Sequence, residues 1–91
     1  MDVLMYRQVL EGDGAKYALL YYLRETEEGY GIRVSAICSD GTQRTAIWSG
    51  VFGEYISCLR CLHRLFRWGV TPMGLFDTLE DMAQSEPYCS R

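Results

Sequence analysis

Four cysteines are the residues whose type and spacing could do chemistry in this chain. Cys58 and Cys61 are two residues apart, as in zinc knuckles and redox pairs, and Cys38 and Cys89 could complete a set of four thiolates. Zinc knuckles place such a pair in a tight turn, whereas this pair lies in a helical pattern without glycine or proline between the thiols. Nothing in the sequence indicates an oxidising compartment, so we expect reduced, structural cysteines, no metal and no cofactor.

His63 is the only histidine, so any histidine-based acid–base mechanism must use it. On an ideal helix it lies about 140° from Cys58 and about 160° from Cys61, so neither thiol can form a dyad with it. Cys89 stays open as a partner because it lies near the C-terminus. The sequence contains no phosphate-binding loop or further catalytic motif, and we predict that the protein is not an enzyme and has no small-molecule substrate.

Arg60, Arg64 and Arg67 recur at spacings of four and three, which places them in one basic stripe along a helix. Such a stripe could contact phosphate, and a small nucleic-acid-binding regulator is therefore the alternative function. The chain carries 9 Lys and Arg against 12 Asp and Glu, a net charge of −3, so the whole molecule does not favour a phosphate backbone. We expect a protein partner rather than nucleic acid.

Asp77, Glu80 and Asp81 are carboxylates that could suggest a site for a hard cation. They lack the glycine-containing loop that shapes an EF-hand site, and charged side chains on a helix are usually exposed. We interpret them as a solvated helix face.

The length and composition indicate one ordered domain. A chain of 91 residues buries roughly 60 to 65% of its unfolded surface, which is too little for a second core. We predict a domain over residues 1–84 and a loose tail over residues 85–91. The longest apolar stretch, Tyr17 to Leu23, is too short to cross a membrane, and the N-terminus lacks the pattern of a secretion signal, so we expect a cytoplasmic protein.

The hydrophobic period changes near Ser49-Gly50, from alternation before it to spacings of three and four after it. The alternating half predicts four strands, and glycine-containing turns separate the first pair and the last pair. The sequence thus predicts an α+β fold in which a four-stranded antiparallel meander precedes two C-terminal helices packed on one face (ββββαα). The expected strands are Val3–Leu10, Lys16–Thr26, Tyr30–Ser39 and Thr42–Ser49.

The dipeptide Asp40-Gly41 between two alternating runs is typical of a two-residue hairpin turn. In that register Ser39 faces Thr42, and the pairs on the core side are Val34 with Ile47 and Ala36 with Thr45. Arg33 then lies opposite Trp48 on the other face, where the guanidinium can stack on the indole.

Angular periodicity predicts a helix from about Phe52 to Trp68 and a second helix that begins at Pro72 and ends near Gln84. Gly69 suits the end of the first helix and Thr71 the N-cap of the second. The stripe expected on the sheet is Phe52, Tyr55, Ile56, Leu59, Leu62 and Phe66, and a second apolar sector is Cys61, Leu65 and Trp68. The face of the second helix expected to be buried is Leu75, Phe76, Leu79, Met82 and Ala83.

Two helices can cover only one face of such a sheet, and the central strand is apolar on both faces. Alternation predicts the exposed side chains of a protein interface on the open face: Leu20, Tyr22, Arg33, Ile37 and Trp48. The leading hypothesis is a non-enzymatic interaction module that forms a homodimer through this face.

Tyr30-Gly31-Ile32 and the segment from Thr71 to Asp81 carry a resemblance to a family of short, uncharacterised Firmicutes proteins. In that family a tyrosine-rich sheet region precedes a proline-started C-terminal helix with a Leu-Asp-Leu-Glu-Asp-like sequence. The resemblance implies a bacterial cytoplasmic protein and assigns no catalytic residue.

Overall fold

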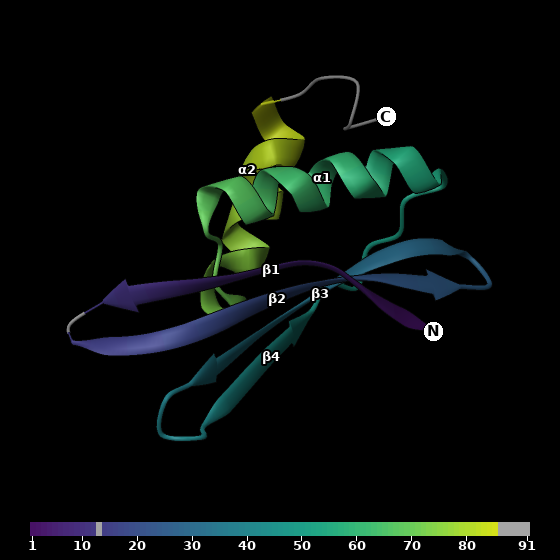
Figure 1. Ribbon diagram of the computed structural model, residues 1–91. Helices are drawn as coiled ribbons and strands as arrows, with labels where there is room; N and C mark the ends of the chain where they lie inside the picture. The colour runs from purple at the N-terminus through teal and green to yellow at the C-terminus, as the bar shows by residue number, and fades with distance from the viewer. Residues whose placement is uncertain (13, 86–91) are drawn as a thin grey trace.

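The protein is a two-layer α+β domain, seen here in a computed structural model that describes residues 1–12 and 14–85 (Figure 1). Neighbouring strands pair antiparallel in the order β1-β2-β3-β4, and the helices follow, which confirms the predicted ββββαα fold. The elements are β1 (Asp2–Gly12), β2 (Ala15–Thr26), β3 (Gly29–Cys38), β4 (Gln43–Ile47), α1 (Tyr55–Trp68), a 3₁₀ helix (Pro72–Gly74) and α2 (Leu75–Ser85). Residues 86–91, most of the predicted tail, lie outside the described part.

The core lies between one face of the sheet and the helices. Alternation along β2 and β3 directs Leu19, Tyr21 and Val34 to the helical layer, where each is fully buried. Figure 1 shows α1 running across this face, and α2 crossing behind α1 as it rises away from the sheet. The other elements contribute further buried side chains, including Leu23, Ile32, Leu62, Leu65, Val70, Leu75 and Leu79. The opposite face of the sheet carries neither helix.

The β3–β4 turn contains three residues rather than the predicted two. The Cys38 amide donates to the Thr42 carbonyl (2.8 Å), the Gly41 amide donates to the Cys38 carbonyl (3.0 Å), and Gly41 has a φ of 91°. These hydrogen bonds, with a glycine of positive φ at the last turn position, are typical of a common three-residue hairpin. Cys38, and not Ser39, therefore faces Thr42.

The extra turn residue shifts the predicted β3–β4 register by one and turns every β4 side chain to the opposite face. Val34 pairs with Ala46 rather than Ile47, and Arg33 pairs with Ile47 rather than Trp48. Ile47 consequently lies on the open face. The placement of Trp48 on that face is wrong, because its ring packs against the core and lies 5.1 Å from the ring of Phe52.

α1 begins later than predicted, because Phe52 does not join it. Phe52 instead forms an isolated bridge with Tyr30, through backbone hydrogen bonds of 2.8 and 2.9 Å. Tyr55 and Ile56, the first helical residues, are 46% and 49% exposed, which corrects their predicted burial. The buried side of α1 combines Leu62 from the predicted stripe, Cys61 and Leu65 from the second sector, and Cys58, which neither included.

The connection between the helices begins as predicted. Gly69 ends α1 in the left-handed conformation (φ 64°), and Pro72 opens the next helical segment directly after the N-cap Thr71. Two aromatic residues predicted to be covered are not: Trp68 is 61% exposed and Phe76 is 49% exposed. No helix in the described part of the chain is long and apolar enough to span a membrane.

Candidate functional site

Cys58 is a core residue and not an exposed thiolate. Its side chain is fully buried, its Sγ atom donates to the Gly31 carbonyl (3.4 Å), and burial raises the pKa of the thiol to about 11. Cys61 is also buried, and Cys38 is half-buried. Within residues 1–12 and 14–85, no three His, Cys, Asp or Glu side chains gather as a metal site. Cys89 lies outside these residues.

The open face carries most of the predicted interface residues. The strand register places Leu20, Tyr22, Arg33 and Ile37 on this face, since Leu19, Tyr21, Val34 and Ala36 occupy the helical side. Sequence reasoning missed several neighbours on this face, among them Leu4 opposite Tyr22, Ile47 opposite Arg33 and the exposed Arg7 opposite Leu20. The exposed fractions are 37% for Ile37, 46% for Ile47 and 47% for Leu4. Together Leu4, Leu20, Tyr22, Ile37 and Ile47 form the open-face patch.

A charged cluster crosses one end of this patch. Arg24 donates from Nε to Asp2 (3.1 Å), and Arg33 donates from Nη1 to the other carboxylate oxygen of Asp2 (2.8 Å). Burial alone would raise the pKa of Asp2, but the hydrogen bonds from Arg33 and then Arg24 lower the pKa below its ordinary value. The Arg33 guanidinium also lies 4.2 Å from the centre of the Tyr22 ring, so its aromatic partner is Tyr22 and not the predicted Trp48.

The role of Asp2 was not foreseen from the sequence. Asp2 pairs with Arg24 across β1 and β2, and this pairing could be predicted only if the register of that hairpin were known. A bulge between Leu4 and Tyr6 shifts this register, so alternation alone does not yield it.

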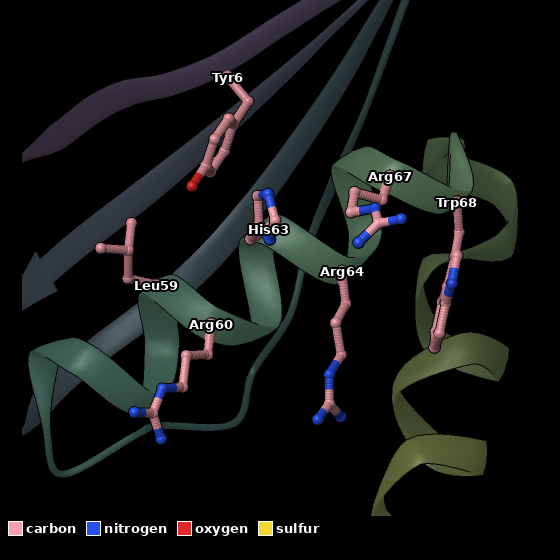
Figure 2. A pocket seen from close by; sticks show the side chains of 7 residues that line it. All are labelled: Tyr6, Leu59, Arg60, His63, Arg64, Arg67 and Trp68. Carbon is pink, nitrogen blue, oxygen red and sulfur yellow. The ribbon is translucent and has the colours of Figure 1, made fainter.

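The predicted basic stripe borders a shallow hollow of about 680 Å³ on α1, away from the open face (Figure 2). Arg60, Arg64 and Arg67 line it together with His63, Trp68 and Tyr6, which comes from β1. In Figure 2, Tyr6 faces His63, whereas Arg60, Arg64 and Trp68 project from the other side of the helix. We call this site the α1 groove.

Packed aromatic rings form one wall of the α1 groove. The Tyr6 ring stacks on Phe66 with centroids 4.9 Å apart and an interplanar angle of 18°, and its centroid lies 5.6 Å from that of His63. His63 itself is exposed. Asp77, Glu80 and Asp81 are exposed as predicted, and in the described part of the chain none of them forms an ion pair with Arg60 or Arg67.

Comparison with known proteins places the chain in a family. The chain matches no curated protein and no solved structure. Residues 1–85, which include all the strands and helices described above, match the model of a family of unknown function, DUF6514. The protein therefore belongs to the family of unknown function DUF6514.

Proposed function

We propose that the protein is a non-enzymatic interaction module whose open face binds a second copy of the chain. The observation that supports this proposal is the open-face patch, where Leu4, Ile37 and Ile47 are between 37% and 47% exposed on a sheet face without a helix. Exposed apolar side chains gathered on one face are typical of an interaction site. Two copies packed face to face would bury it as the two sheets of a sandwich bury their inner faces.

The charges of the open face favour a second copy as the partner. A two-fold interface brings the same patch of both chains together, so an uncompensated charge at its centre would repel its own copy. Arg24 and Arg33 are both hydrogen-bonded to Asp2 of the same chain, which reduces that repulsion. Ser35 and Thr45 also satisfy each other, with their hydroxyl oxygens 2.9 Å apart. These groups are thus satisfied within one chain, and the exposed Arg7 opposite Leu20 is a further charge on the same face.

The four isoleucines test this proposal directly, because they lie on the open face, in the core and on α1. Ile37 and Ile47 lie on the open face, Ile32 is fully buried in the core, and Ile56 is 49% exposed on α1. We expect the methyl NMR signals of Ile37 and Ile47 to shift on dilution of an isoleucine-labelled sample, while those of Ile32 and Ile56 stay in place. Concentration-independent signals at Ile37 and Ile47, or a shift confined to Ile56, would refute the open-face dimer.

We also propose an organismal origin and a cellular location for the protein. We infer a cytoplasmic protein of Firmicutes bacteria, supported by the resemblance of the Tyr30-Gly31-Ile32 and Thr71–Asp81 segments to a family of short proteins from these bacteria.

A further inference from the structure

α1 is a local positive region in an acidic protein. Tyr55–Trp68 contains Arg60, Arg64 and Arg67 and no acidic residue, whereas the rest of the chain has six basic and twelve acidic residues. Electrostatic attraction at close range depends on this local distribution because salt screens charges beyond about 10 Å. The net charge of −3 therefore does not prevent the binding of an anion at α1.

The arginines are spaced along the groove and not gathered at one point. With a rise of about 1.5 Å per residue, Arg60 and Arg64 are about 6 Å apart along the helix axis, and Arg64 and Arg67 about 4.5 Å. Both Arg60 and Arg67 are exposed, and in the described part of the chain neither is paired with a carboxylate. An extended ligand with regularly repeated negative groups suits such a row better than a single compact anion.

Aromatic surfaces accompany the guanidinium groups. The sequence shows no aromatic residues interleaved with these arginines in a single-strand-binding motif, but folding brings Tyr6 from β1 beside His63. Trp68 stands at the end of the same groove, and its side chain is 61% exposed although burial of an indole is favourable. Flat π surfaces beside a row of cations are the combination that binds stacked bases and their phosphates.

We propose that the α1 groove binds single-stranded nucleic acid without sequence preference. Arg60, Arg64 and Arg67 contact successive phosphates, and bases stack on Trp68 and on the Tyr6–His63 wall. An acidic peptide would satisfy the guanidinium groups but would leave the exposed indole unused. This proposal is independent of the open-face dimer, because the groove and the open-face patch lie on different layers of the domain.

Fluorescence anisotropy with a fluorescein-labelled oligothymidylate of about ten nucleotides tests the proposal. If three phosphates are neutralised, binding should be saturable at low salt. The logarithm of the association constant should then fall with the logarithm of the salt concentration at a slope of roughly −2. Arg60→Ala combined with Arg67→Ala should reduce the slope to roughly −0.7, because one arginine remains. Arg44→Ala, which removes an exposed arginine from β4, is the matched control and should leave both affinity and slope unchanged.

A second variant separates stacking from charge. Trp68→Ala removes a largely exposed ring, so the protein should stay folded, and it should weaken oligothymidylate binding roughly tenfold without altering the salt slope. Absence of saturable binding at low salt would overturn the proposal. Polyglutamate binding as tight as that of the oligonucleotide, and insensitive to Trp68→Ala, would overturn it in favour of an acidic protein partner.

Discussion

Asp2 is the residue that organises the charges of the open face. Its carboxylate accepts hydrogen bonds from Arg24 and Arg33, and the Arg33 guanidinium in turn covers the Tyr22 ring. Asp2 thereby connects strands β1, β2 and β3. A chain that lost this carboxylate would hold two uncompensated guanidinium groups at one end of the open-face patch.

Asp2→Asn should lower the free energy of unfolding by about 1 to 3 kcal/mol at pH 7, because hydrogen bonds to a charged group are lost. The pKa of Asp2 in the folded protein is lowered from 3.8, so its stabilisation is present above that pH and is lost as the pH falls through the folded value. Urea unfolding of both proteins from pH 7 to pH 2 measures this. A difference between them that stays constant over the whole range would show that the Asp2 cluster does not contribute.

The contribution of Cys58 to stability depends on pH in the opposite direction to that of Asp2. Its pKa rises from 9.0 to about 11 in the folded protein, so the neutral thiol stabilises the fold below pH 9 and this contribution declines as the pH rises towards 11. Compared with Cys58→Ala, the wild-type protein should therefore lose more stability between pH 9 and pH 11. Chemical unfolding at several pH values measures this difference, and parallel curves for the two proteins would contradict a buried neutral thiol.

At the residue scale, alternation along β2 and β3 correctly places Leu20, Tyr22 and Ile37 on the open face. Trp48 is misplaced because the type of turn, and not the composition of β4, decides its face. Asp40-Gly41 is compatible with both a two-residue and a three-residue hairpin, and the two alternatives differ by one residue in register.

At the scale of elements, α1 and α2 show which features of a helix angular periodicity can predict. It identifies both helices and their connection at Gly69 and Pro72, but it predicts burial at Ile56 and Phe76, which are 49% exposed. Periodicity defines an apolar side of a helix but not how much of that side the partner covers. Here a four-stranded sheet and a helix that crosses behind α1 cover only part of it (Figure 1).

A comparison of two helical variants tests the division between buried and exposed faces. Leu79→Ala removes a side chain that is 6% exposed at the middle of α2 and should lower the free energy of unfolding by about 2 to 4 kcal/mol. Arg60→Glu reverses an exposed charge and should change it by less than about 0.5 kcal/mol. Thermal and urea unfolding give both values. A larger effect for Arg60→Glu would mean that the arginines stabilise the fold and are not a solvated stripe.

At the scale of the whole molecule, the chain order of the strands made the fold predictable. Each strand pairs with its neighbour in sequence, so local turns and alternation determine the sheet. The α1 groove was less accessible to sequence reasoning, since Tyr6 is far in sequence from His63 and lies beside it only in the folded chain, where it also stacks on Phe66. The arginine spacing was visible in the sequence, but the aromatic wall was not.

The two proposed surfaces are compatible in one assembly. The helices cover one face of the sheet, so a dimer formed through the opposite, open face leaves both α1 grooves accessible. Two grooves on one dimer would bind a long single strand more tightly than one, because the second contact is intramolecular. The two interactions differ in their response to salt: apolar association is nearly insensitive, whereas groove binding weakens steeply.

Sedimentation velocity over a range of concentrations tests the open-face dimer most directly, with two matched isoleucine variants. Ile37→Glu places a charge on the open face, and Ile56→Glu places the same charge on the exposed side of α1, where the original side chains are 37% and 49% exposed. We expect the wild-type protein and Ile56→Glu to form a dimer as concentration rises, at low and high salt alike, and Ile37→Glu to remain a folded monomer because a buried unpaired charge opposes association. A wild-type protein that sediments as a monomer at high micromolar concentration, or an Ile37→Glu variant that dimerises as the wild type does, would contradict the proposed interface.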